Sequence, residues 1–128
     1  MAKKILIVDD EEDIAFSVAR RLSAVGYEVV CAEDGVEGLQ RAQTENPDLI
    51  LLDLMLPKMD GYKVCRLLKF DERYKRIPII MVSARSQDED IALGRETGAE
   101  AYMTKPVDSA ALLDKVKELL ETPAAATD

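Results

Sequence analysis

The chain has 128 residues, a formal net charge of −8 and 48% apolar residues, which suits one domain with a single well-filled core. The acidic balance argues against binding to nucleic acid or to an anionic membrane surface, since both need a basic face on the protein. The absence of histidine, together with only two cysteines, argues against zinc and iron–sulfur sites and against a Ser-His-Asp triad.

Five short apolar runs alternate with five helical patterns along the chain. The runs cover residues 5–8, 29–32, 49–52, 79–82 and 101–103. The first, third and fourth are continuous, as expected for parallel strands covered on both faces, whereas the fifth is too short to assign by itself. The first run lacks the length and cleavage site of a signal peptide, and no run approaches the roughly 20 residues of a membrane span. We therefore expect a cytoplasmic protein.

The helical patterns lie between these runs and show apolar residues at helical spacing. The first is marked by Ile14, Val18, Leu22 and Val25 and ends at Gly26, and the second by Val36, Leu39 and Ala42 and ends before Asn46-Pro47. The third begins near Asp60-Gly61 and is marked by Tyr62, Leu67 and Leu68, and the weaker fourth covers 91–97 and ends at Gly98. The fifth begins after Pro106 and Asp108 and is marked by Leu112, Leu113, Val116, Leu119 and Leu120.

Strict alternation of strands and helices predicts an α/β fold with a parallel sheet and right-handed crossovers. Five strands suit the doubly wound, flavodoxin-like (βα)5 arrangement with strand order 2-1-3-4-5. We predict one domain over residues 1–121. Residues 122–128 lack a periodic apolar face, so we expect a disordered tail or the start of a linker there.

Polar side chains follow the predicted strands where each one ends. They are Asp9 and Asp10, then Asp53, then Ser83, and finally Lys105. Because the carboxyl ends of parallel strands share one edge, three carboxylates, a hydroxyl and an ammonium should converge there. Neighbouring carboxylates repel one another unless positive charge lies among them, which Lys105 and a hard divalent cation such as Mg²⁺ would supply. An aspartate in such a pocket can accept a phosphoryl group as an acyl phosphate.

Four stretches carry these residues, and together they resemble the receiver domain of response regulators in two-component signalling (CheY-like). They read ILIVDDEED at 5–13, PDLILLDLMLPKMDG at 47–61, IPIIMVSA at 77–84 and GAEAYMTKP at 98–106. The resemblance covers about residues 3–121. It implies a phosphoacceptor domain that takes its phosphoryl group from a sensor histidine kinase or a phosphotransfer protein and catalyses only its own transfer and autodephosphorylation.

The resemblance also assigns roles around the phosphoacceptor. Asp53 would carry the phosphoryl group, Lys105 would contact it, and Ser83 would move toward it while Tyr102 changes rotamer. Lys105 and Pro106 would be joined by a cis peptide bond. The switching face would consist of the fourth helix, the fifth strand and the fifth helix.

For the metal, the resemblance implies one Mg²⁺ ion held by four residues. Asp10 would bind it directly and Asp9 directly or through water, while Asp53 and the backbone carbonyl of Met55 would complete the protein ligands.

Other interpretations stay open for these residues. Asp9 and Asp10 are also ordinary helix caps, and Lys105 alone would be a surface lysine. An aspartate-based phosphatase of the haloacid dehalogenase type would need a second aspartate two residues after the nucleophile, where Met55 stands after Asp53. A nucleotide- or flavin-binding module lacks its glycine-rich motif. A pure interaction domain with a vestigial pocket would not need the intact site.

Two surface predictions complete the analysis. The basic cluster of Lys69, Arg73, Lys75 and Arg76 is interpreted as a solvated surface. The domain is expected to be a monomer or weak dimer with an unknown downstream effector. It should not form the charge-paired dimer of receivers resembling the winged-helix subfamily, because alanine follows Glu100 where that subfamily has a second acid, and the fifth helix has lysines but no arginine.

Overall fold

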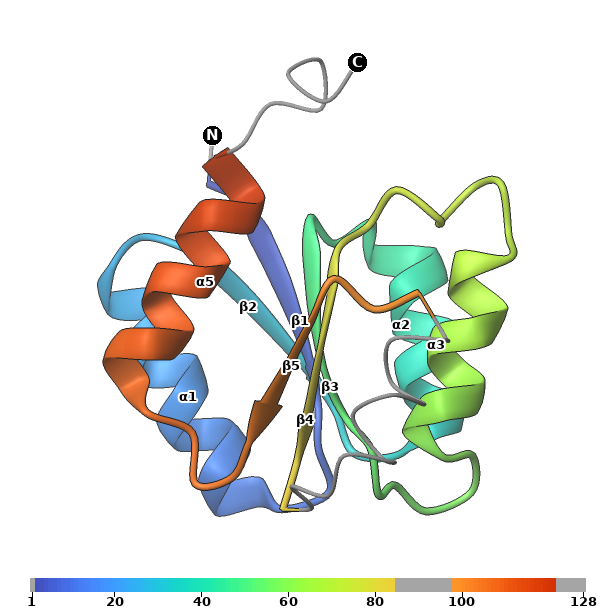
Figure 1. Ribbon diagram of the computed structural model, residues 1–128, viewed down its shortest axis with the longest axis horizontal. Coiled ribbons are helices and arrows are strands. Elements are labelled where there is room, and N and C mark those ends of the chain that lie inside the picture. The colour runs from blue at the N-terminus through green and yellow to red at the C-terminus, as the bar shows by residue number, and fades with distance from the viewer. Residues whose placement is uncertain (1, 85–97, 122–128) are drawn as a thin grey trace.

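The computed structural model describes residues 2–84 and 98–121, and Figure 1 shows a central parallel sheet with helices on both sides. The sheet has five strands in the order β2-β1-β3-β4-β5, and every neighbouring pair is parallel. The strands are β1 Lys4–Val8, β2 Glu28–Ala32, β3 Leu49–Asp53, β4 Ile79–Ser83 and β5 Ala101–Thr104. The predicted fold class and strand order are confirmed.

Each strand is one residue longer than the apolar run that predicted it. β3 and β4 extend through Asp53 and Ser83, which pair in register with Val82 and Thr104 respectively. The ladder is made by backbone N–H and C=O groups, which do not depend on the polarity of the side chain. The two polar residues are therefore the last members of their strands rather than the first residues of the following loops.

In the part of the chain that the structure describes, four helices cover the sheet: α1 Glu12–Ala24, α2 Gly35–Glu45, α3 Gly61–Lys69 and α5 Ser109–Glu121. α1 and α5 lie on one face and α2 and α3 on the other (Figure 1). Side chains cap three of them: Asp34 accepts from the N–H of Glu37 at 2.8 Å, Asp60 from that of Lys63 at 2.9 Å, and Asp108 from that of Ala111 at 3.4 Å. The fourth predicted helix, at 91–97, lies outside the described residues. Within the described ranges, no helix combines the length and apolarity needed to cross a membrane.

The core has one part on each face of the sheet. Side chains such as Leu6, Ile50 and Met81 pack toward α2 and α3. The residues next to them along the strands, such as Ile7 and Leu51, point to the other face and pack toward α1 and α5. β1, β3 and β4 are buried almost throughout, because helices cover both of their faces. This explains why the sequence of these strands is continuously apolar rather than alternating.

Lys69 at the end of α3 makes a polar contact with Glu100, just before β5, which we call the Lys69–Glu100 clasp. Its ammonium donates to Glu100 Oε2 at 2.8 Å and to the carbonyls of Ile77 at 2.8 Å and Lys75 at 3.2 Å. Glu100 Oε1 accepts from the N–H of Ile79 at 2.8 Å. The side chain of Lys69 is only 10% exposed, so its interpretation as part of a solvated basic surface is wrong. Its partner Glu100 lies 31 positions further along the chain, beyond the reach of local sequence patterns.

Candidate functional site

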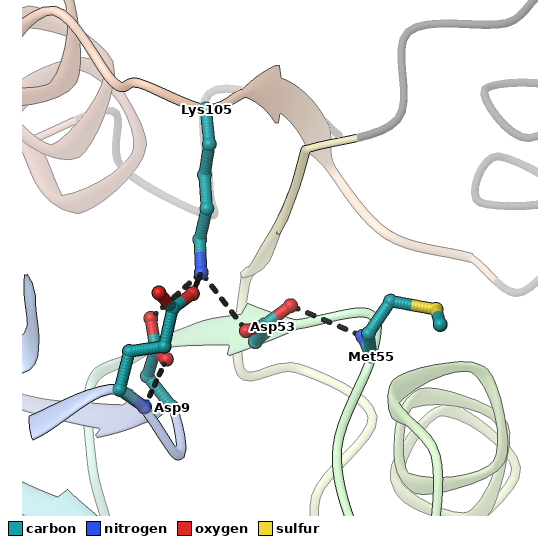
Figure 2. A network of polar contacts seen from close by, with 5 residues as sticks. Asp9, Asp53, Met55 and Lys105 are labelled. Carbon is teal, nitrogen blue, oxygen red and sulfur yellow. Dashed lines mark hydrogen bonds and ion pairs between the residues drawn. The ribbon is translucent and has the colours of Figure 1, made fainter.

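The predicted acids and lysine meet at the carboxyl edge of the sheet. Asp9 follows β1, Asp53 ends β3, and Lys105 follows β5 and points its ammonium between the two carboxylates (Figure 2). The Lys105 Nζ atom lies 2.9 Å from Asp53 Oδ2 and 3.1 Å from Asp9 Oδ2. Both aspartates are buried, at 5% and 8% exposure. Three segments far apart in sequence thus build one charged pocket.

Asp53 is held at both of its carboxylate oxygens. Oδ1 accepts from the backbone N–H of Met55 at 3.0 Å, and Oδ2 accepts from Lys105. Burial raises the pKa of Asp53, hydrogen bonds from Lys105 and Met55 oppose that rise, and the charge of Asp9 adds to it. The net pKa lies above the usual value for aspartate. The carboxylate is therefore oriented by two donors and only partly stabilised in its charged form.

Lys105 has a third carboxylate partner that the sequence analysis did not identify. Its Nζ lies 2.9 Å from Glu11 Oε1. Burial alone would lower the pKa of Lys105, but hydrogen bonds to Asp53 and Glu11, together with the charge of Asp53, raise the pKa well above its usual value. The ammonium is therefore charged throughout the ordinary pH range. The available signal in the sequence was the position of Glu11, two residues after Asp9 at the same sheet edge.

The peptide bond between Lys105 and Pro106 is cis, as the resemblance predicted. The N–H of Lys105 donates to the carbonyl of Ser83 at 2.7 Å, so the backbone of the lysine is tied to the end of β4. Ser83 itself is fully buried. Tyr102, on β5, is half-buried and packs against the core cluster on the α2 and α3 side.

Asp9 and Asp10 do not cap α1. The N-cap residue is Glu11, whose side chain makes no capping hydrogen bond. Asp9 Oδ1 instead accepts from the backbone N–H of Glu11 at 2.9 Å, which orders the turn before the helix. Asp10 is exposed and lies on the same turn. The capping interpretation of these two residues is therefore wrong.

The carboxylates fit a hard divalent cation. Asp9, Asp10 and Asp53 each offer one oxygen, and these oxygens lie within 4.8 Å of one another. Oxygen-only ligand sets of this kind suit Mg²⁺ or Ca²⁺ rather than softer metals. The backbone carbonyl of Met55 was predicted as a further ligand. Met55 lies two residues after Asp53, and its side chain is exposed. The pocket could hold a metal ion, and the choice of Mg²⁺ belongs to the proposal below.

Known proteins with similar sequences are named as transcriptional regulators. The chain is 47% identical over 120 residues to the alkaline phosphatase synthesis transcriptional regulatory protein PhoP of Bacillus subtilis, covering 94% of this chain and 49% of that protein. It is 45% identical over 117 residues to the DNA-binding dual master transcriptional regulator RpaA of Synechocystis, covering 91% of this chain and 48% of that protein. The chain thus spans about half the length of these relatives.

Solved structures agree with the sequence relatives. A CheY-like response regulator receiver domain protein from Methanospirillum hungatei superposes with a TM-score of 0.88 at 36% identity, covering 94% of this chain and 95% of that one. The family described as the response regulator receiver domain matches residues 5–117. With the acid pocket and the strand order already in place, the chain belongs to the receiver domains of two-component response regulators.

Proposed function

We propose that Asp53 accepts a phosphoryl group from a sensor histidine kinase or a phosphotransfer protein in a Mg²⁺-dependent reaction. The observation that carries this proposal is the buried Asp53 carboxylate, which lies 2.9 Å from the Lys105 ammonium and within one cluster of carboxylates with Asp9 and Asp10. The proposal includes the cytoplasmic location expected from the sequence, where such donors present their phosphoryl groups.

In the proposed reaction, a carboxylate oxygen of Asp53 attacks the phosphorus atom. The bond from phosphorus to the donor's imidazole nitrogen breaks, and the imidazole leaves with that electron pair. Lys105 stabilises the negative charge on the phosphoryl oxygens, and the hydroxyl of Ser83 donates a hydrogen bond to one of them. Mg²⁺, held by the three aspartates and the carbonyl of Met55, would supply further positive charge there. Attack of water on phosphorus later breaks the bond between phosphorus and the Asp53 oxygen, which releases inorganic phosphate and regenerates the carboxylate.

Acetyl phosphate provides the direct test of this function. With Mg²⁺, the intact mass should rise by one phosphoryl group, and peptide mapping should place that group on Asp53. EDTA should prevent the reaction, because the carboxylates alone repel the anionic donor. Labelling that persists in EDTA would contradict the proposal. Sustained turnover of an added phosphomonoester would favour the haloacid dehalogenase-type phosphatase instead, although Met55 stands where that enzyme needs its second aspartate.

The output is proposed to pass through the face that includes β5 and α5, together with the fourth helix predicted at 91–97. We expect phosphorylation or beryllofluoride to shift amide NMR signals most strongly in 101–104 and 109–121, because Lys105, which directly follows β5, contacts Asp53 in the pocket. The two states need to differ by only a few kcal/mol for this population shift. Shifts confined to α1 and α2 would refute this assignment.

The downstream step is proposed to be control of transcription, as the names of the two relatives state for those proteins. This chain carries a formal net charge of −8, so contact with DNA is assigned to another domain or partner rather than to the receiver itself. We also propose that the receiver catalyses only its own phosphorylation and dephosphorylation and does not turn over external substrates.

The phosphorylated domain is predicted to remain outside the charge-paired dimer described for the winged-helix subfamily. Glu100 is already paired with Lys69 in the clasp, and Lys115 lies 2.7 Å from Glu118 of its own helix. Exposed ion pairs contribute only about 0–1 kcal/mol each. Breaking pairs within one copy to form equivalent pairs between two copies would therefore add little to the free energy of dimer formation. Sedimentation of the beryllofluoride-treated protein at tens of micromolar, as an order-of-magnitude choice, should show a monomer. A dimer that pairs Glu100 with Lys117 of a second copy would show the prediction wrong.

A further inference from the structure

We infer that Glu11 is a positioning residue that competes with the phosphoryl group for Lys105. Its negative charge thereby lowers the affinity of the pocket for a phosphoryl group and raises its affinity for a metal ion. This inference rests on the proposed function and deepens it. The Lys105 ammonium has three N–H donors, and its three carboxylate contacts are Asp53 at 2.9 Å, Glu11 at 2.9 Å and Asp9 at 3.1 Å. Lys105 must therefore give up at least one carboxylate before it can bind a phosphoryl oxygen.

The three carboxylates differ in how easily they can be released. The side chains of Asp9 and Asp53 are only 9% and 6% exposed, whereas that of Glu11 is 56% exposed. A carboxylate that leaves the ammonium must be solvated by something else, and only Glu11 has water readily available. The carboxylates that could hold a metal ion are those of Asp9, Asp10 and Asp53. Among the described partners of Lys105, Glu11 is the one that does not belong to this cluster. Glu11 is thus the partner that Lys105 exchanges for a phosphoryl oxygen.

The negative charge of Glu11 should act in opposite directions on the two ligands of the pocket. It partly neutralises Lys105, so the ammonium repels a nearby divalent cation less and attracts a phosphoryl anion less. Glutamine at this position keeps the length and a carbonyl acceptor but lacks the charge. A residue with a merely structural role would weaken both ligands together, or neither.

The experiment compares Glu11→Gln with Asp13→Asn in the otherwise intact chain. Both substitutions remove one negative charge near the start of α1, where Asp13 lies in the first turn. The described residues give Asp13 no contact with Lys105. Two dissociation constants are measured for each protein: that of Mg²⁺ alone by calorimetry, and that of beryllofluoride at saturating Mg²⁺ by NMR titration.

We expect Glu11→Gln to weaken Mg²⁺ binding roughly three- to tenfold and to tighten beryllofluoride binding by a similar factor, from the size of a unit charge at this range. Asp13→Asn should change each constant less than about twofold, because its charge is solvated and screened. Glu11→Asp, which keeps the charge but shortens the reach, should retain most of the Mg²⁺ affinity and still tighten beryllofluoride binding.

The outcomes separate this inference from the function on which it rests. If the unaltered protein binds neither Mg²⁺ nor beryllofluoride, the proposed function fails. If it binds both and Glu11→Gln behaves like Asp13→Asn, or weakens both ligands, the role of Glu11 is overturned while the function stands. Since Glu11 is more than half exposed, glutamine should not disturb folding, and Glu11→Asp gives a second variant in which the same tightening of beryllofluoride must appear.

Discussion

Replacing Asp53 with asparagine is expected to abolish phosphorylation and, at the same time, to stabilise the protein in EDTA. The amide cannot act as the nucleophile, so acetyl phosphate with Mg²⁺ should leave its mass unchanged. In EDTA the buried Asp53 carboxylate lies in a cluster with Asp9 and Asp10, and asparagine removes one charge from that cluster. Lys105 retains Asp9 and Glu11 as partners. We expect the free energy of unfolding to rise by about 1 kcal/mol, as neutralising buried charge can do.

The pH dependence of this stabilisation has a defined sign. Burial raises the pKa of Asp53 in the folded protein, so the stability associated with its proton is complete below the ordinary aspartate pKa of about 3.9. That stability is lost as the pH rises through the raised pKa. Asparagine has no such loss. The difference in urea unfolding free energy between the two proteins should therefore be small near pH 4 and grow toward neutrality.

The matched control is Asp114→Asn, which makes the same substitution at an exposed position of α5. It should leave both phosphorylation and stability nearly unchanged. If Asp53→Asn destabilised the protein in EDTA, or if its advantage shrank with rising pH, the view of Asp53 as an incompletely compensated buried charge would be wrong.

Replacing Gly61 with alanine is expected to be among the most destabilising single-methyl additions in the chain. Gly61 begins α3, and its N–H donates to the carbonyl of Leu54 at 2.9 Å. An added Cβ would overlap the carbonyl oxygen of Asp53 and lie 2.8 Å from the Cα of Leu54. These are backbone atoms at the end of a buried strand, so they cannot rotate away. We expect a loss of about 3 kcal/mol or more in urea unfolding, at the upper end of overpacking effects.

The same substitution should also displace Asp53, the proposed phosphoacceptor, since the clash is with its own carbonyl. The rise in melting temperature caused by Mg²⁺ should therefore shrink in Gly61→Ala. Gly26→Ala is the control: Gly26 has a φ of +102° but nothing within 4 Å of an added Cβ, so it should cost only about 1–2 kcal/mol of conformational energy and keep the full response to Mg²⁺. Equal loss of that response in both variants would show that it reflects stability rather than position.

The sequence predicted the sheet well because its central strands satisfy one simple physical condition. β1, β3 and β4 are covered on both faces. A strand in that position has no face exposed to solvent, so its sequence is continuously apolar. The strand order then followed from the alternation with helices, and the convergence of Asp9, Asp53 and Lys105 followed from the shared carboxyl edge. These steps needed only local patterns and one rule of topology.

What the sequence did not predict depends on partners distant along the chain. Lys69 was taken as a solvated lysine, but its ammonium is used by Glu100 and by two carbonyls in the segment between α3 and β4. Glu11 was not among the predicted site residues, but it pairs with Lys105, which follows the edge strand β5. Long flexible side chains can reach many places, so their partners appear only when the backbone around them is known.

The position of Asp53 inside the sheet ladder determines where motion can occur. The strand that carries it is hydrogen-bonded on both sides, to β1 and to β4, so its amides should exchange with solvent only when the whole domain unfolds. The entropy needed to place the proposed nucleophile has thus been lost already during folding. Differences in reaction rate among domains of this kind should therefore arise from the side chains and loops around the acceptor. The strand itself would behave as a fixed support in every state of the switch.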